Sequence, residues 1–168
     1  MRTRIGLLLV AVVMGGVVIA GRAAGPPRIG TKAPVFALPD LNGKVRSLAE
    51  EIKSHRVTLV NFWATWCPPC RGEIPALVAF YKDFAPQGVQ ILAVDLKEGM
   101  QEVSKFASGQ GMTFPVLIDR TGAVADMYGI SGIPTTYILD ANGVIRDVIV
   151  GGTTKSVLSS KVRRILPK

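Results

Sequence analysis

The two cysteines of this 168-residue chain, Cys67 and Cys70, lie between a strand-like run and a helix-like run. Residues 57–63 form the first run, and the apolar periodicity from about residue 69 to 84 predicts the helix. A thiolate is the reactive form of cysteine, and the free N–H groups at a helix N-terminus stabilise it. Two intervening residues place both sulfurs on the first turn, where one can attack a disulfide and the other can resolve the mixed disulfide. The motif therefore predicts a redox-active disulfide that needs no other cofactor.

Three other uses of the cysteine pair are supported to different degrees by the rest of the chain. A zinc site usually needs four ligands, but there is no second cysteine pair and the single histidine, His55, lies in a polar stretch. A purely structural disulfide would close too small a loop to add much stability. Two soft thiolates suit Cu(I), although the five methionines are scattered along the chain. We therefore expect no metal site, and a Cu(I)-binding metallochaperone module stays as the alternative.

The sequence around the cysteines resembles the active-site segment of thioredoxin-like proteins of the TlpA/ResA type, relatives of the AhpC/TSA redoxins. The resemblance is carried by residues 60–75, VNFWATWCPPCRGEIP. Residues 132–136, GIPTT, resemble the thioredoxin loop that holds a cis-proline, and residues 33–38, APVFAL, resemble the N-terminal lead-in of this branch. Similarity extends from about residue 29 to the C-terminus, and it implies a thiol-disulfide oxidoreductase of the protein-disulfide reductase type.

The predicted elements alternate between strands and helices before ending in a hairpin. Strands are expected at 57–63, 89–96, 114–118, 135–139 and 144–150, and helices at 69–84, 100–108, 123–128 and after Thr153 or Thr154. The pair Asn42-Gly43 predicts an earlier hairpin, and Ser47 with Glu50 predicts a capping box that opens a short helix. The βαβ pattern implies a parallel core, whereas the closing hairpin is antiparallel.

These elements predict an α/β thioredoxin-like fold, a mixed central sheet flanked by helices with an N-terminal β-hairpin extension. Residues 94–114 are longer than the corresponding path in a minimal thioredoxin. The resemblance implies that they hold a central βα insert.

Within the motif, Cys67 is expected to be the exposed nucleophile and Cys70 the deeper, resolving thiol. Pro68 and Pro69 have no N–H groups, so they cannot donate to the Cys67 thiolate, and the amide of Cys70 is left to do so. Weaker stabilisation of the thiolate favours a reductant. A dithiol oxidase or isomerase of the same fold stays as an alternative, because the reduction potential sets the direction of exchange.

Glu73 lies three residues after Cys70, and helical spacing places it on the same face, near the dithiol. A partly buried carboxyl group there would have a raised pKa and could move the proton that thiol exchange requires. The alternative is an ordinary first-turn glutamate favoured by the helix dipole. ResA-like proteins carry an active-site glutamate at the matching place, and Asn61 stands where thioredoxins have a buried aspartate. The resemblance thus makes Glu73 the third catalytic residue.

The resemblance also implies a substrate-binding surface around the motif and a cis-proline loop. Its residues are Trp66, Pro68, Pro69, Ile133, Pro134 and Thr135. A cis bond before Pro134 would turn the Ile133 backbone toward the sulfurs, where its N–H and C=O could pair with an extended substrate. The alternative is a trans proline that begins an edge strand. Trp66 is expected to form an exposed apolar rim for the substrate, and Trp63 suits the rim or the core equally.

The N-terminus has the pattern of a targeting segment. Arg2 and Arg4 precede an uncharged, mostly apolar run at residues 5–21, and the small-residue cleavage site at 18–20 is weak, which favours an uncleaved anchor. The predicted division is a signal peptide or N-terminal membrane anchor at 1–24, a short tether at 25–32 and a thioredoxin-like domain at 33–168. We therefore expect an extracytoplasmic location, periplasmic or on the outer face of the cytoplasmic membrane.

The net charge of +8 is spread along the chain without aromatic residues interleaved, which argues against nucleic-acid binding. The resemblance implies client proteins with disulfides, either apocytochrome c or copper-site proteins, and a membrane electron donor of the CcdA or DsbD type. A peroxiredoxin is excluded, because Val60 and Ala64 stand where that family has the residues that polarise a peroxide.

Overall fold

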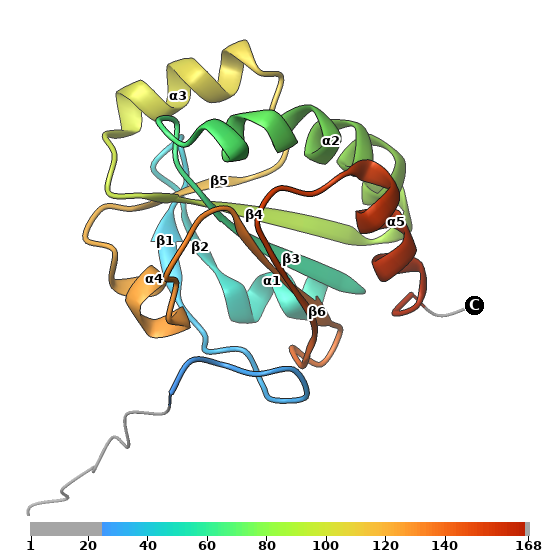
Figure 1. The fold of residues 1–168 in the computed structure, drawn as a ribbon. Coiled ribbons are helices and arrows are strands. Elements are labelled where there is room, and N and C mark those ends of the chain that lie inside the picture. The colour runs from blue at the N-terminus through green and yellow to red at the C-terminus, as the bar shows by residue number, and fades with distance from the viewer. Residues whose placement is uncertain (1–24, 167–168) are drawn as a thin grey trace, which may run out of the picture.

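A computed structural model describes residues 25–166, which form a five-stranded sheet with helices on both faces (Figure 1). The order across the sheet is β5-β4-β3-β6-β7. The strands are β3 (Val57–Trp63), β4 (Val89–Leu96), β5 (Val116–Asp119), β6 (Thr135–Asp140) and β7 (Ile145–Val150). Strand β4 runs parallel to β3 and β5, whereas β6 is antiparallel to β3 and β7. The predicted mixed α/β sheet is confirmed.

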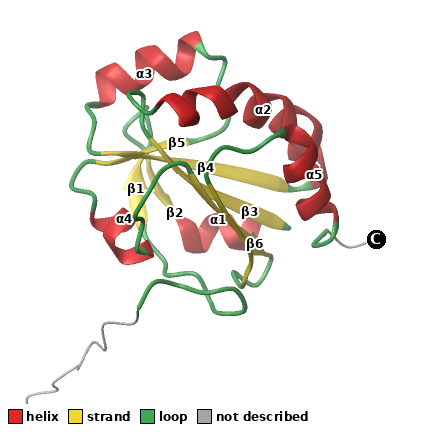
Figure 2. Cartoon of the chain, in the orientation of Figure 1, coloured by secondary structure: helices red, strands yellow, loops and turns green. Residues whose placement is uncertain are grey.

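One face of this sheet is covered by three helices and the other by two shorter ones (Figures 1 and 2). Helices α2 (Pro68–Phe84), α3 (Met100–Gly109) and α5 (Lys155–Arg163) pack into one apolar cluster. Helices α1 (Leu48–Ser54) and α4 (Ala123–Tyr128) pack into the other, and a short 3₁₀ helix at Ala85–Gln87 follows α2. Residues 94–114, expected to hold a βα insert, contain the end of β4 and helix α3, and strand β5 follows them.

Strand β3 is buried along its whole length because strands flank it on both sides and helices cover both faces. Its side chains alternate between the two clusters: Leu59 and Trp63 pack with α2, and Val60 and Phe62 pack on the opposite face. The same alternation directs Asn61 to the α2 face. A polar side chain is thereby placed inside the larger cluster, next to the helix that carries the cysteines.

Helix α2 buries one stripe of side chains at intervals of three or four residues. The stripe consists of Cys70, Glu73, Ile74, Leu77, Phe80 and Phe84. The helix begins at Pro68, one residue before the predicted start, and continues through the exposed Pro75. The kink expected at that proline stays a prediction. A carboxyl group therefore occupies the apolar face of α2, one turn after the second cysteine.

The predicted N-terminal hairpin is present as β1 (Ala37–Pro39) and β2 (Val45–Ser47). Asp40 organises the turn, because its Oδ1 accepts the amides of Asn42 and Lys44 at 2.9 and 3.0 Å. Its Oδ2 lies 3.0 Å from Nε of Arg46. A bridge between Asp40 and Leu117 joins this turn to β5, which attaches the hairpin to the edge of the main sheet.

The turn between β6 and β7 repeats the same arrangement one hundred residues later. Oδ1 of Asp140 accepts the amides of Asn142 and Val144, again at 2.9 and 3.0 Å, and Oδ2 pairs with Arg146. The two stretches read DLNGKVR and DANGVIR, so the same residues build the same turn. In both, the glycine has a positive φ, 76° at Gly43 and 71° at Gly143.

Two local predictions are corrected, and a third is confirmed for one of its two alternatives. The capping box is wrong: Ser47 occupies the N-cap, but its side chain makes no capping hydrogen bond, and the amide of Leu48 donates instead to Phe36 O at 2.9 Å. Strand β5 begins at Val116, after Pro115, which has no N–H for the ladder. Of the two threonines considered for the last helix, Thr154 is the cap and accepts from Val157 N at 3.3 Å.

The predicted signal peptide or anchor at 1–24 lies outside the described residues. Within 25–166, no helix is long and apolar enough to cross a membrane. The segment expected to be a tether is bound to the domain from Gly30 on, because Gly30 N donates to Ile145 O at 2.8 Å and Ala33 N donates to Gly143 O at 2.9 Å.

Replacing Asp140 with asparagine should destabilise the fold in a pH-dependent way. Burial raises the pKa of Asp140, but hydrogen bonds from Val144, Arg146 and Asn142 outweigh it and lower the pKa below the ordinary 3.8. The stabilisation is therefore present above pH 3.8 and is lost as the pH falls through the folded-state pKa.

We expect Asp140→Asn to lose about 1–3 kcal/mol of unfolding free energy at pH 7 and much less near pH 3, measured by urea denaturation. Asp126→Asn, on the exposed surface of α4, is the control. An equal deficit at both pH values would contradict this interpretation.

Candidate active site

The two cysteines lie where β3 passes into α2. Cys67 is the N-cap of the helix, Pro68 and Pro69 are its first two residues, and Cys70 follows on the first turn. The cysteines form a disulfide with a Cα–Cα distance of 5.3 Å. The predicted pairing and its position at a helix N-terminus are thus present in the structure.

One backbone amide of the first turn of α2 donates a hydrogen bond to the sulfur of Cys67. The N–H of Cys70 donates to Cys67 Sγ at 3.2 Å, and neither Pro68 nor Pro69 has an N–H to add. The expected order of exposure holds, with Cys67 at 3% and Cys70 at 0%. The expectation that Cys67 is exposed is wrong, however, since the loop before Pro134 covers it and Ile133 O lies 3.7 Å from Cys67 Sγ.

That covering loop contains a cis peptide bond between Ile133 and Pro134, as the resemblance implies. Two hydrogen bonds hold the loop: Thr135 Oγ1 donates to Gly132 O, and Gly151 N donates to Pro134 O, both at 2.8 Å. Strand β6 begins directly afterwards and pairs with β3. The loop is therefore anchored to the same strand that delivers the cysteines.

The two tryptophans have different surroundings. Trp66 is 65% exposed beside Cys67, which places a large apolar surface next to the disulfide. Trp63 is 1% exposed and its ring packs against Phe106 of α3, with the ring centroids 5.6 Å apart. Trp66 thus lies on the rim, and Trp63 belongs to the core.

Glu73 is held inside the protein by two hydrogen bonds and is only 2% exposed. Its Oε1 accepts from Asn61 Nδ2 at 2.9 Å, and its Oε2 accepts the backbone N–H of Thr153 at 3.0 Å. Asn61 Nδ2 also donates to Thr136 Oγ1 at 2.9 Å. Residues from β3, β6 and the loop before α5 therefore position one carboxyl group on α2.

Burial raises the pKa of Glu73 to about 7, and the hydrogen bonds from Asn61 and Thr153 offset only part of this effect. Near neutral pH, both protonation states are populated. Because Glu73 and Cys70 share the buried stripe of α2, a carboxyl group with this pKa is suited to take up and release the proton of the resolving thiol.

The sequence analysis did not identify three of these contacts: the Asn61 donor, the Thr136 hydroxyl and the Thr153 amide. Asn61 and Thr136 face each other in the β3–β6 register. Two polar residues at matching positions of neighbouring strands are a signal that could have been used. The Thr153 amide leaves no such trace in the sequence.

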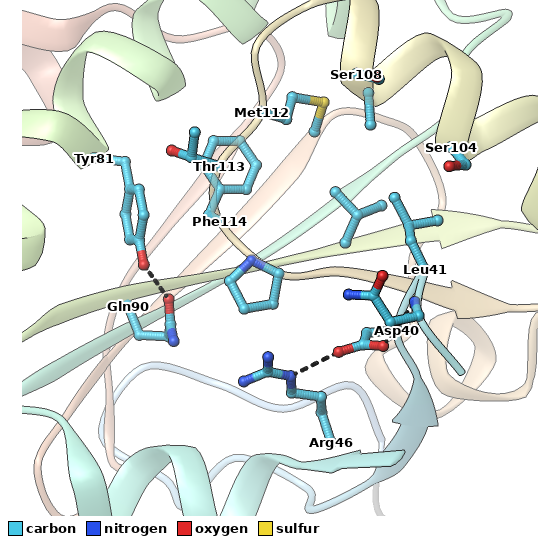
Figure 3. A pocket seen from close by; sticks show the side chains of 14 residues that line it. Asp40, Leu41, Arg46, Tyr81, Gln90, Ser104, Ser108, Met112, Thr113 and Phe114 are labelled. Atoms are coloured by element: carbon cyan, nitrogen blue, oxygen red, sulfur yellow. Dashed lines mark hydrogen bonds and ion pairs between the residues drawn. The ribbon is translucent and has the colours of Figure 1, made fainter. Parts of the chain in front are cut away.

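A cavity of about 550 Å³ lies elsewhere, between the N-terminal hairpin, α2, α3 and β5 (Figure 3). It includes Gln90 at the start of β4, whereas the cysteines follow the end of the parallel strand β3. The cavity and the cysteines therefore lie at opposite ends of these strands. Arg46 in the cavity is already paired with Asp40 and Glu51, and the Tyr81 hydroxyl donates to Gln90. The Arg46 guanidinium and the Tyr81 hydroxyl are thus both engaged within the protein.

Within residues 25–166, no three or more His, Cys, Asp or Glu side chains are arranged to hold a metal ion. A metal bound at the dithiol would have to rely on the two sulfurs.

Comparisons with known proteins agree on one family. Residues 29–148 match the model of the AhpC/TSA family. The thiol-disulfide oxidoreductase ResA of Geobacillus thermodenitrificans is 39% identical over 83% of this chain and 79% of its own. ResA of Bacillus subtilis is 38% identical over 98% of this chain and 92% of its own.

Solved structures show the same fold. A thiol:disulfide interchange protein of the thioredoxin family from Chlorobium tepidum has a TM-score of 0.74 at 34% identity, covering 83% of this chain and 98% of its own. StoA from Bacillus subtilis has a TM-score of 0.67 at 29% identity, covering 79% and 98%.

The raised pKa of Glu73 should appear in the stability of the protein. Between pH 4.5 and about 7 the unfolded chain releases the Glu73 proton and the folded protein keeps it. The free energy of unfolding then falls by about 1.4 kcal/mol per pH unit from this group as the pH rises.

We expect the decline between pH 5 and 8 to be smaller in Glu73→Gln than in the wild type by an amount on the order of 3 kcal/mol, measured by urea denaturation. Glu50→Gln, on the exposed surface of α1, should leave the decline unchanged. A constant difference between Glu73→Gln and wild type at all pH values would rule out the raised pKa.

Proposed function

This chain belongs to the AhpC/TSA family and is a thiol-disulfide oxidoreductase of the ResA type, and from this premise we propose that it reduces disulfides of client proteins outside the cytoplasm. The observation that carries the proposal is the Cys67–Cys70 pair at the start of α2, with a buried glutamate one turn further on. Together they supply the nucleophile, the resolving thiol and the proton acceptor that the reaction needs.

The exchange begins from the dithiol. The Cys67 thiolate attacks one sulfur of a client disulfide, forms a mixed disulfide and releases the first client thiolate, which takes a proton. Cys70 then gives its proton to Glu73, and its thiolate attacks Cys67 Sγ. The bond to the client breaks, the second client thiolate leaves, and the Cys67–Cys70 disulfide forms. Two electrons have passed to the client.

The direction of transfer follows from how poorly the Cys67 thiolate is stabilised. Strong oxidants of this fold stabilise the reduced form, which requires donors at the nucleophilic sulfur. In the first turn here, prolines remove two of those donors and the Cys70 amide at 3.2 Å remains. A less stabilised thiolate gives up its electrons more readily, which supports a reductant.

The surface around the sulfurs supports a peptide-like client. Trp66 offers an exposed apolar surface beside Cys67, and Ile133 O of the cis-proline loop lies 3.7 Å from Cys67 Sγ. The loop is fixed by Thr135 and Gly151, so it is preorganised. We assign Trp66, Ile133, Pro134 and Thr135 to client binding, with the Ile133 backbone pairing with an extended segment.

The cellular setting is also part of the proposal. The apolar N-terminal segment supports export, with the domain tethered at the outer face of the membrane or released from it. An oxidising compartment requires that a reductant be supplied continuously with electrons, and a membrane donor of the CcdA or DsbD type would supply them. Clients would be apocytochrome c or copper-site proteins, as the resemblance implies.

Replacement of the resolving cysteine should trap the proposed intermediate. Reduced Cys70→Ser, mixed with a disulfide-bonded peptide, is expected to accumulate a mixed disulfide through Cys67, because nothing remains to displace the client. Reduced Cys67→Ser should accumulate none, since Cys70 is fully buried on the inner stripe of α2 whereas Cys67 lies at the N-cap beside exposed Trp66. Intact mass spectrometry of both variants checks the assignment.

Two results would contradict it. Equal trapping through both cysteines would remove the assigned roles. Stoichiometric retention of Cu(I) by the wild type, without reduction of the peptide, would favour the metallochaperone alternative.

The role of Glu73 can be tested on the second step. In Glu73→Gln the Cys70 proton has no internal acceptor, so resolution of the mixed disulfide at pH 7 should slow by about 100-fold. The inflection of the resolution rate near pH 7, expected in the wild type, should disappear and leave only a rise at higher pH, where the Cys70 thiol loses its proton to solvent. Single-turnover release of the peptide between pH 5 and 9 measures both effects, with the exposed Glu50→Gln as control. An unchanged pH profile would remove Glu73 from the mechanism.

A further inference from the structure

A second pair of carboxyl groups is buried near the dithiol, outside the reaction described above. Asp95 in β4 is 0% exposed, and Glu98, three residues later, is 8% exposed. Asp95 lies opposite Trp63 in the register of β3 and β4. Acidic side chains are almost never fully buried unless they are paired. The pair therefore requires an explanation.

Glu98 is bound to the loop that leads to Cys67. Its Oε2 accepts the backbone N–H of Thr65 at 2.6 Å, and its Oε1 accepts the Thr65 hydroxyl at 2.5 Å. Both carboxylate oxygens are thus used by one residue, two positions before the nucleophile. Charge-assisted bonds of this kind are the stronger class of hydrogen bond, so an ionised Glu98 fixes the loop.

Asp95 differs from Glu98 in the hydrogen bonds made to its carboxyl group. In the part of the chain that the structure describes, neither carboxyl oxygen of Asp95 accepts a hydrogen bond in favourable geometry. Burial, together with a hydrogen bond to the Glu98 side chain and the charge of that side chain, outweighs a contact with the Glu98 backbone N–H and raises the pKa of Asp95 to about 8. At neutral pH Asp95 therefore keeps its proton and donates it toward Glu98.

Charged groups on the neighbouring elements do not reverse this effect. Glu102 on α3 adds further negative charge that favours the protonated form of Asp95. Arg120, after β5, donates to the backbone carbonyl of Glu98 at 3.4 Å rather than to either carboxyl group. Asp119, at the end of β5, accepts the amides of Val124 and Ala125, so its carboxylate is bound to the first turn of α4.

We propose that Asp95 and Glu98 share one proton, and that this pair positions Cys67 for exchange by holding the Thr65 loop. Asp95 is then a positioning residue that acts through Glu98, and Glu98 acts through Thr65. The inference rests on the proposed dithiol exchange. It adds a second proton site, carried by β4 and the loop after it, which is separate from Glu73 on α2.

Loss of the shared proton has a defined consequence. When Asp95 ionises, its proton goes to solvent and two negative charges remain in one buried space. Like charges this close repel each other. Glu98 follows the end of β4 whereas Asp95 lies within the strand, so we expect the Glu98 side chain to move and to strain its two bonds to Thr65. The hydrogen bonds from Thr65 to Glu98 should weaken. The conformation of the loop that carries Trp66 and Cys67 should therefore depend on pH.

The oxidised protein allows this titration to be observed alone, because disulfide-bonded cysteines do not titrate. The two tryptophans of the chain, Trp63 and Trp66, flank Thr65 and report on the loop by fluorescence. We expect oxidised Glu73→Gln to show a transition near pH 8, and Glu73→Gln combined with Asp95→Asn to lack it. A transition that persists without Asp95 would overturn the proposal.

Exchange kinetics test the positioning role. Thr65→Val removes the hydroxyl donor at nearly constant volume, and we expect attack of Cys67 on a disulfide-bonded peptide to slow by about 10-fold. Thr65→Ser, which keeps the donor, should recover most of that loss, whereas a merely structural role would give equal effects. Asp126→Asn on the exposed face of α4 controls for removal of an aspartate.

The outcomes separate this inference from the proposed function. If the wild type oxidises peptides instead of reducing them, the proposed direction fails, while the fluorescence transition still tests the acid pair. If reduction occurs but Thr65→Val and Thr65→Ser behave alike, the positioning role of Asp95 and Glu98 is contradicted, while the proposed reductase function still stands.

Discussion

Strand β3 is the constraint on which the rest of the site depends. Hydrogen bonding to β4 on one side and β6 on the other leaves it no freedom to shift, and both apolar clusters are built on its side chains. The side chain of Asn61 within the strand holds Glu73, and Thr65 just after it is held by Glu98. The strand therefore carries both the residue that positions Glu73 and the loop to Cys67, which Glu98 holds.

The buried carboxyl groups of Glu73 and Glu98 have different roles because their hydrogen-bond partners differ. Glu73 has a pKa near 7 because burial outweighs two hydrogen bonds, and it can exchange a proton. Glu98 accepts two short hydrogen bonds from Thr65 and acts as a fixed anchor. Burying acidic groups costs stability unless they are paired. Their retention beside a reactive disulfide is consistent with functional sites breaking the rules that cores otherwise follow.

Most of the fold could be predicted from the sequence, because continuous apolar runs such as 57–63 and 89–96 belong to fully covered strands and matched the structure residue for residue. Local signals were weaker when tertiary contacts competed. Ser47 makes no side-chain capping bond, and the first amide of α1 is instead satisfied by Phe36, a residue distant in the sequence. The cis bond before Pro134 came from the family resemblance, since physics alone favours trans.

The site was predicted as a set of residues but not as a surface. Cys67 is covered because Ile133, 66 positions away, folds over it, and no local pattern encodes that contact. The Thr153 amide reaches Glu73 across 80 positions for the same reason. What spacing did give was the placement of Glu73 on the buried stripe of α2, and its pKa follows from that placement.

The most direct test of the central claim is the reduction potential of the Cys67–Cys70 pair, measured by equilibration of the protein with glutathione or dithiothreitol. A dithiol whose nucleophile lacks two backbone donors should have a potential near or below about −270 mV, as in reducing members of this fold. A value near about −120 mV, typical of the strong oxidants, would contradict the account and assign the protein to disulfide formation.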